Sequence, residues 1–239
     1  SNYCLGFWIY LVFFFALLDI ALILRKRVWK KPAFTWHTAT FGIILLLSAG
    51  LTVCGGIHAR HVTVNTQNVT IHKSVDGMKE MKIVLVSEWH LGYSIGVRDM
   101  KQMVKKINEQ NPDLVLVAGD IYDTALPPAA AVLLLDWFLT ELAHRNIPVL
   151  AIAGNHDSAE RLDYAAGLLS NQQVYLAGQF TSAPRRVILQ DEFGELTFDL
   201  LPFVRPATVR HCLPDADIRD EDSAIAAALG PLPTAGDRR

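Results

Sequence analysis

The sequence predicts an α/β domain that is preceded by two membrane-spanning helices. Two long apolar runs fill the first quarter of the 239-residue chain. After them, short apolar runs alternate with segments of helical periodicity, which is typical of a sheet that is parallel at least in its first half. Hydrophobic residues make up 51% of the chain and charged residues 19%, which excludes a disordered or low-complexity protein.

The two apolar runs cover residues 5–24 and 41–57, and Asp19 is the one charged residue within them. A helix over the first run would be ~30 Å long, which matches the hydrocarbon core of a bilayer. The basic segment at residues 25–31 is expected to face the cytoplasm, which places everything after residue 57 on the outer side. Two buried core helices, or a signal sequence in residues 25–56, are the alternatives.

Charge divides the chain at the same boundary. Residues 1–57 carry a net charge of +4, and the rest of the chain carries −6. The three cysteines are Cys4, Cys54 and Cys212, which lie far apart in the sequence. Neither a disulfide framework nor a zinc-type cysteine pair is therefore expected.

The elements that follow are predicted from the spacing of apolar residues. Residues 58–81 are expected to form a linker with a leading strand or hairpin, because residues 61–72 alternate apolar and polar side chains. Residues 82–239 are expected to form the α/β domain. Continuous apolar runs predict buried parallel strands at residues 82–87, 114–118 and 148–153. Helices are predicted at residues 97–110, 129–144 and 159–170, and further strands at 174–176, 186–190 and 196–201.

Polar side chains follow each of the three predicted buried strands. Glu88 and His90 follow the first strand, Asp120 the second, and Asn155 and His156 the third. Because ligands bind at the carboxyl ends of strands in an open α/β sheet, we expect these five side chains to meet at one edge. Carboxylate, imidazole and amide groups together suit manganese, iron or zinc better than a metal that prefers thiolates.

The three clusters resemble the signature of the calcineurin-like metallophosphoesterases, which reads D-x-H, then G-D-x-x-D, then G-N-H-D or G-N-H-E. The resemblance covers residues 82–158 and implies the layered sheet fold of that family. It implies a phosphoester hydrolase that uses a metal-activated water and two divalent metal ions, with manganese expected and iron or zinc as alternatives.

Individual roles also follow from the resemblance. Glu88 and His90 would bind one metal, Asp120 would bridge both metals, and Asn155 would bind the second. His156 would contact the phosphate and stabilise the transition state. Asp157 would orient His156 from behind.

Two departures from the family signature affect the expected site. Glu88 stands where the family has Asp. Its extra methylene moves the carboxylate by ~1.5 Å, against a tolerance of ~0.5 Å for a preorganised site, so weaker metal binding is expected. The later His and G-H-x-H motifs are absent, since the one histidine after His156 is His211 in an unmatched context. The domain is therefore expected to be truncated before its final histidine motifs, and an inactive fragment, or a composite joined near residues 119–123, is an alternative.

The two parts of the chain resemble different branches of the family. Residues 124–239, including the segment Leu201-Pro202-Phe203-Val204-Arg205-Pro206, resemble the SbcD nuclease subunits of bacterial DNA-repair complexes. That branch implies a DNA phosphodiesterase, acting as an exonuclease or endonuclease, with DNA and an SbcC-like ATPase subunit as partners in the cytoplasm.

Residues 1–123 resemble membrane-anchored bacterial phosphoesterases. This branch implies an extracytoplasmic enzyme, held in the membrane by residues 5–24 and 41–57, that acts on a small or lipid-linked phosphoester. A homodimer is left open by both interpretations.

Overall fold

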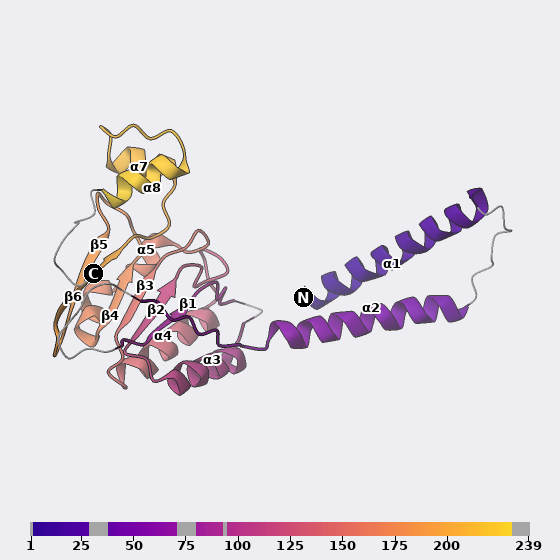
Figure 1. Ribbon diagram of the computed structural model, residues 1–239, viewed down its shortest axis with the longest axis horizontal. Coiled ribbons are helices and arrows are strands. Elements are labelled where there is room, and N and C mark those ends of the chain that lie inside the picture. Colours follow the sequence, from indigo (N-terminus) through magenta and orange to yellow (C-terminus); the bar gives the residue numbers. More distant parts are fainter. Residues whose placement is uncertain (1, 29–37, 71–79, 93–94, 231–239) are drawn as a thin grey trace. The chain divides into compact units, whose positions relative to one another are not determined.

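The computed structural model describes residues 2–28, 38–70, 80–92 and 95–230, which divide into two compact units at residue 65 (Figure 1). The first unit holds two long helices, α1 (Asn2–Arg27) and α2 (Thr38–Ala59). Both are long and apolar enough to cross a membrane, and both contain the predicted runs. Phe15 of α1 contacts Phe41 of α2 at a ring-centroid distance of 5.9 Å.

Apolar side chains on both helices are largely exposed, as at Leu5 and Leu46. Core helices are mostly buried, so this exposure favours the membrane-spanning alternative for the residues that the structure describes. The basic residues Arg25, Lys26 and Arg27 lie in the last turn of α1, whereas residues 29–37 lie outside the described part of the chain.

The second unit is built on a four-stranded parallel sheet with the order β1-β2-β3-β4. The strands are β1 (Ile83–Val86), β2 (Leu114–Ala118), β3 (Val149–Ile152) and β4 (Val174–Ala177). Helices α3 (Val97–Gln110) and α4 (Ala129–Ala143) connect the first three strands. Helix α3 buries Met100, Val104 and Ile107 on one face, as its periodicity predicts, and packs with α4 against the sheet.

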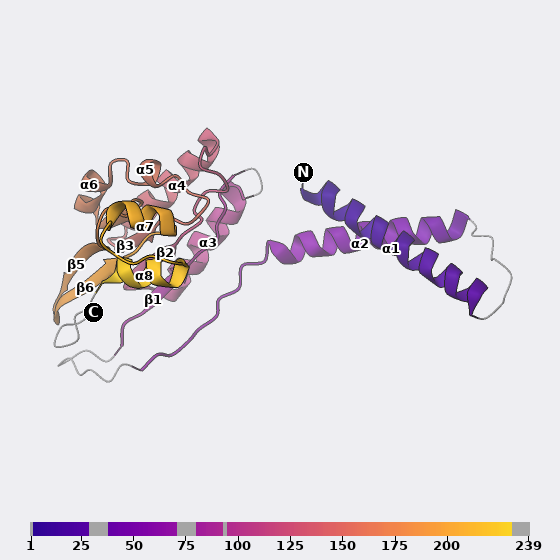
Figure 2. The ribbon, with the colours of Figure 1, turned by 90° about the horizontal axis from the view of Figure 1, so that it is seen from above.

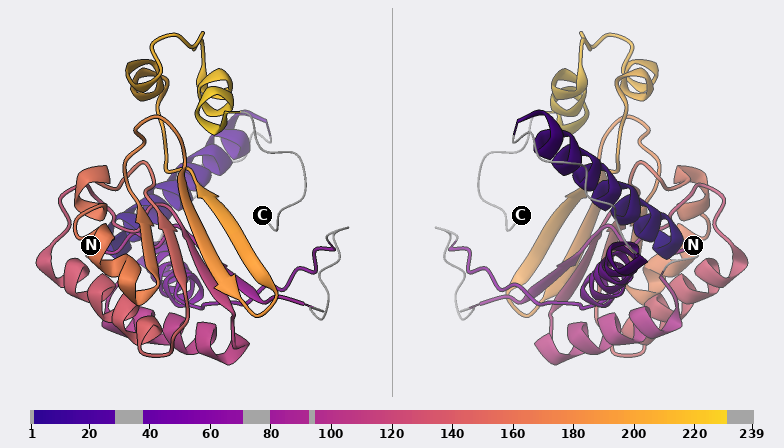
Figure 3. Two further views of the ribbon diagram at one scale, coloured as in Figure 1. Left: turned by 90° about the vertical axis from the view of Figure 1, so that its left-hand side faces the viewer. Right: turned by 90° about the vertical axis from the view of Figure 1, so that its right-hand side faces the viewer.

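The other side of the sheet is covered by an antiparallel hairpin of β5 (Arg185–Asp191) and β6 (Gly194–Leu200). A second apolar cluster joins the two layers, with Leu114 and Leu150 from the sheet and Val187 and Leu200 from the hairpin. Figure 3 shows the hairpin and the helices on opposite sides of the sheet. The mixed α/β layers expected from the sequence are thus confirmed.

Two further helices, α7 (Pro206–Cys212) and α8 (Glu221–Leu229), follow the hairpin and lie side by side (Figure 2). They share a small apolar cluster with Val209 and Ala224 at its centre. Helix α8 begins at a capping box in which the Asp220 carboxylate accepts a hydrogen bond from the Ser223 backbone N–H at 2.9 Å. The sequence pattern did not predict either helix.

Three expectations about the elements are wrong. Residues 61–70 form no strand, and residues 71–72 lie outside the described residues. The described part of this segment has no neighbouring strand to pair with, and its Val69 is 81% exposed. Strand β1 is parallel but not buried. No β1 residue joins the apolar cluster that the hairpin forms with the other three strands, and Leu85 is 63% exposed.

The third wrong expectation is the single helix at residues 159–170. The chain forms two short helices, α5 (Ala159–Leu162) and α6 (Ala166–Leu169), and a 3₁₀ turn, η1 (Ser170–Gln172). Ala165 adopts a left-handed conformation with φ of 60° between the helices. The carboxylate of Asp163 accepts hydrogen bonds from Gly178 and Gln179 N–H, both at 2.8 Å, and this long-range contact fixes the break.

Candidate metal centre

The candidate site lies where the chain leaves β1, β2 and β3, at one edge of the sheet. Backbone hydrogen bonds tie the first two of these loops together. His90 N–H donates to the Asp120 carbonyl at 2.9 Å, Leu91 N–H to the Ile121 carbonyl at 2.8 Å, and Asp123 N–H to the Leu91 carbonyl at 3.1 Å. The side chains carried by the two loops are therefore held by a continuous ladder beyond the strands.

Left-handed backbone conformations are concentrated in these loops. Glu88, His90 and Asp120 have φ values of 57°, 48° and 45°. Such conformations are uncommon outside glycine and persist where the surrounding structure imposes them, often at functional sites. Here they turn three polar side chains out of the strand direction and toward one another.

The first group of candidate ligands consists of Glu88, His90 and Asp120, whose ligand atoms lie within 4.8 Å of one another. His90 Nε2 lies 3.2 Å from Glu88 Oε2 and 3.9 Å from Asp120 Oδ2. The Asp120 side chain is buried, whereas that of Glu88 is 66% exposed. The candidate site therefore combines a buried carboxylate, that of Asp120, with an exposed one, that of Glu88, and is open to solvent on the Glu88 side.

A second group joins His90 to Asp123 and His156. His90 Nδ1 lies 3.6 Å from Asp123 Oδ1, and the His90 and His156 rings meet edge to face at 4.9 Å between centroids. Asp123 was not among the residues assigned from the sequence. Its position at the end of the segment Gly119-Asp120-Ile121-Tyr122-Asp123 was the signal that could have identified it.

His156 is fixed by two contacts from the loop after β2. Its backbone N–H donates to Asp120 Oδ1, and its ring Nδ1 lies 3.0 Å from the Asp123 carbonyl oxygen. Since a carbonyl only accepts, Nδ1 carries the proton and Nε2 is left for a ligand. The hydrogen bond to the Asp123 carbonyl is the largest cause that raises the pKa of His156. Burial opposes it, and the charges of Asp120, Asp123 and Glu88 add to the increase.

Asp157 differs from its expected role. Its Oδ2 accepts hydrogen bonds from the backbone N–H groups of Gly154 at 2.8 Å and Ile121 at 3.1 Å, and Oδ1 accepts from Tyr122 N–H at 2.8 Å. The expectation that Asp157 orients the His156 ring is therefore not what the structure shows, since that ring is held by Asp123. Asp157 joins the loops after β2 and β3 instead.

The same carboxylate affects a neighbouring phenol. Burial, together with the negative charges of Asp157 and Asp136, raises the pKa of Tyr122 to about 12. Tyr122 therefore stays protonated throughout the physiological range and supports the loop as a neutral group.

Gly154 lies where only a glycine fits. A Cβ added at this position would lie 2.1 Å from Asp120 Oδ1 and 2.2 Å from Asp120 N. The close approach of the β3 loop to the β2 loop therefore depends on the missing side chain. It allows Asp120 to hold the His156 backbone and face the ligand group at the same time.

Asn155 lies beside Glu88 and Asp120 in the wall of a cavity of about 360 Å³. The far wall comes from residues 201–204 and from Glu221 and Ile225 of α8. All the sequence-predicted ligands, Glu88, His90, Asp120 and Asn155, thus lie at the same sheet edge, with His156 next to them. Asp157 is in the supporting layer.

The donor set fits divalent metal ions. It combines carboxylate and imidazole with a neutral amide, the mixture that manganese, iron and zinc accept. His90 Nδ1 is buried without a hydrogen-bond partner among the described residues, so that this ring has an unsatisfied polar atom at the cluster. Glu88 Oε2 reaches the His90 ring in spite of its longer side chain, as the 3.2 Å contact shows.

The chain was compared with the models of known families. The family model of the calcineurin-like phosphoesterases matches residues 81–233, which spans the whole sheet, the hairpin and helices α7 and α8.

Proposed function

Because the chain belongs to the calcineurin-like phosphoesterase family and is thus a metal-dependent phosphoester hydrolase, we propose that it cleaves phosphodiester bonds of DNA. Glu88, His90, Asp120 and Asn155 would hold divalent metal ions, for which we propose manganese. When bound, such ions supply an activated water and neutralise charge on the phosphate. Asp123 is a further candidate ligand, because it lies in the second group of donors.

The observation that carries the proposal is the position of His156. Its ring lies against the ligand groups, is exposed to solvent, and keeps Nε2 free because Nδ1 donates to the Asp123 carbonyl. A phosphate held at the ligand groups therefore lies next to Nε2, which donates a hydrogen bond when the ring is protonated, the form that the raised pKa of His156 favours. His156 stabilises negative charge on the phosphate oxygens or protonates the leaving oxygen.

The choice of DNA is supported by the open cavity and by the resemblance of residues 124–239 to SbcD nuclease subunits. A cavity that is open to solvent, with the exposed Glu88 in its wall, accepts a strand that continues past the site on either side. The proposal includes an SbcC-like ATPase subunit as partner and a location of the domain in the cytoplasm.

A second candidate function is favoured by helices α1 and α2, which are long and apolar enough to cross a membrane. With the basic residues Arg25, Lys26 and Arg27 at the cytoplasmic side, the domain would lie outside the cytoplasm. Its substrate would then be a small or lipid-linked phosphoester.

The test is hydrolysis by the full chain in detergent micelles with Mn²⁺, measured on linear DNA and on bis(p-nitrophenyl) phosphate. We expect both to be cleaved, and His156→Ala to lower the rate ~10²–10⁴-fold, the usual contribution of a general acid or base. His211→Ala is the matched control, since His211 is an exposed histidine at the end of α7. Activity that survives His156→Ala, or cleavage of neither substrate, would contradict the proposal.

The location of the domain is tested separately. Protease added to intact cells degrades the domain if it lies outside, and this result would favour the second candidate function. Protection until the cells are opened would favour the DNA substrate.

A further inference from the structure

The cavity beside the ligand groups has two ends of different chemistry. Glu88, Asp120 and Asn155 line the polar end, whereas residues 201–204 and Ile225 line the apolar end together with one carboxylate, Glu221 of α8. At about 360 Å³ it lies within the range of small-molecule sites. Only the polar end is used by the phosphoester chemistry, so that the apolar end is available for the group attached to the phosphate.

Phe203 is the aromatic residue of the apolar end, and its backbone is held in place. Its N–H donates to the carbonyl of Ala153 at 2.8 Å, directly before the Gly154-Asn155-His156 segment. The neighbours Leu201 and Val204 pack into the apolar cluster of α7 and α8. Phe203 is in none of the apolar clusters of the described residues, and it is 49% exposed. Its ring is therefore positioned at the cavity without a role in the core.

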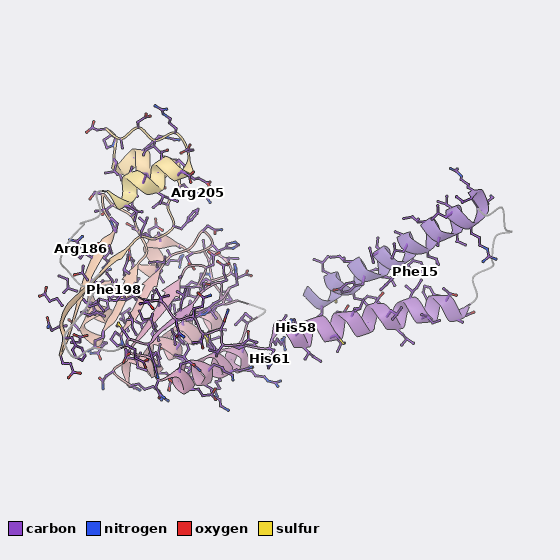
Figure 4. The ribbon with its side chains drawn as sticks, viewed as in Figure 1. Phe15, His58, His61, Arg186, Phe198 and Arg205 are labelled. Atoms are coloured by element: carbon purple, nitrogen blue, oxygen red, sulfur yellow. The ribbon has the colours of Figure 1, made fainter. Side chains whose placement is uncertain are left out.

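Arg205 adds a positive charge to the same ring. Its guanidinium carbon lies 6.0 Å from the centroid of Phe203, at the outer limit of a cation–π contact. Among the described residues no carboxylate forms an ion pair with Arg205, in contrast to Arg186, which binds Asp199 at 2.7 Å. Figure 4 shows Arg205 at the base of the α7–α8 pair. An exposed aromatic face with an uncompensated cation suits a flat ring that carries a phosphate.

We propose that Phe203 and Arg205 form a stacking subsite for the nucleobase next to the scissile phosphodiester. The base lies on the free face of Phe203, and the Arg205 guanidinium contacts the adjoining phosphate. This inference rests on the proposed DNA substrate and limits that substrate to DNA with an unpaired base at the site. A stacked base must be unpaired, so the enzyme acts on single strands, strand ends or short oligonucleotides in preference to intact duplex.

An alkyl chain is the competing occupant, because the same end of the cavity is apolar. The observations favour a base, since Leu201 and Val204 already pack against α7 and α8 and leave the flat ring of Phe203 as the accessible apolar group. The cation beside that ring contributes nothing to the binding of an alkyl chain.

The test uses the full chain in detergent micelles with Mn²⁺ and two substrates. The first is the dinucleotide thymidylyl-(3′→5′)-thymidine, and the second is the same molecule with an abasic sugar in place of one nucleoside. We expect Phe203→Ala to raise the KM for the base-bearing dinucleotide about tenfold, the usual effect of losing one stacked base, with kcat and the abasic substrate little changed. Phe203→Tyr restores the KM, whereas Phe203→Leu does not.

Tyr164→Ala is the matched control, because Tyr164 is 82% exposed and does not line the cavity. Arg205→Gln is expected to raise the KM and to reduce its dependence on salt, while Arg205→Lys keeps most of the wild-type behaviour. Wild-type KM values for Phe203→Ala, or full rescue by Phe203→Leu, would overturn the stacking subsite.

A binding measurement separates this inference from the proposed reaction. Saturation-transfer NMR with thymidine 5′-monophosphate reports contact of the base protons with the protein and needs no turnover. Signal that depends on Phe203, without any hydrolysis by the wild type, supports the subsite and contradicts the proposed reaction. Hydrolysis that depends on His156, with neither signal nor KM affected by Phe203→Ala, contradicts the subsite and leaves the reaction standing.

Discussion

Asp157→Asn is the substitution that tests most directly how the metal centre is held together. The wild-type carboxylate accepts three backbone N–H groups, from Ile121, Tyr122 and Gly154. An asparagine keeps one acceptor oxygen, which can take the place of Oδ2 and accept the hydrogen bonds from Ile121 and Gly154. Its NH₂ group then takes the place of Oδ1 and faces the Tyr122 N–H donor. At least one hydrogen bond to a charged acceptor is lost, and two donors are placed against each other.

The loss of one such hydrogen bond costs about 1.5–3 kcal/mol of the free energy of unfolding. The affected loops carry Asp120 and Asn155, so their separation also moves the candidate ligands. We therefore expect Asp157→Asn to lower both stability and Mn²⁺ affinity, the latter by at least tenfold, as is typical when a supporting group of a metal site is lost.

The assay is urea unfolding of the full chain in detergent, combined with Mn²⁺ titration by calorimetry. Asp163→Asn is the matched control, because Asp163 also accepts two backbone N–H groups, from Gly178 and Gln179, and neither belongs to the site. It should lower stability by a similar amount and leave Mn²⁺ affinity unchanged. If the two variants lose equal stability and both keep wild-type Mn²⁺ affinity, the positioning role of Asp157 is refuted.

Three further predictions follow from the geometry. Gly154→Ala should destabilise the protein by about 1–3 kcal/mol through overpacking and weaken Mn²⁺ binding, because the new Cβ would meet Asp120 Oδ1 at 2.1 Å. In the control Gly167→Ala, the new Cβ meets nothing within 4 Å, so urea unfolding should show no loss. Glu88→Gln should weaken Mn²⁺ binding about tenfold or more in the calorimetric titration but change stability by less than about 0.5 kcal/mol, because the side chain is 66% exposed. Hydrogen bonds from the Ser223 side chain and backbone lower the pKa of Asp220, so its stabilisation of α8 is present above the unfolded pKa and lost as the pH falls through the folded value. The protection factors of the α8 amides, which correct for the pH dependence of intrinsic exchange, should therefore fall on acidification below pH ~4 in the wild type, and less so in Asp220→Asn.

Much of the sheet could be predicted because its signals are local. Continuous apolar runs identified β2 at residues 114–118 and helical periodicity identified α3 at residues 97–110, with the observed bounds. The polar clusters at the ends of the predicted strands then indicated that Asp120, Asn155 and His156 would follow neighbouring strands. The meeting of these side chains at one edge is a consequence of parallel strand order, which the alternation of strands and helices already implies.

What the sequence could not supply depends on contacts between distant segments. The Asp163 carboxylate accepts hydrogen bonds from Gly178 and Gln179 N–H, and these contacts break the expected helix at residues 159–170. No pattern within residues 159–170 predicts them. The alternating residues 61–70 form no strand, since a strand needs a partner that its own sequence does not specify.

The sequence by itself therefore determined the two apolar helices, the α/β class and the chemical type of the candidate metal ligands, because each rests on residue type and local spacing. Tertiary structure alone decided that Asp123 joins the candidate ligands and holds His156, that Asp157 joins two loops, and that Phe203 lies at the same cavity as Asn155. These roles depend on where separate loops approach one another, and such distances are set by the packing of the whole domain.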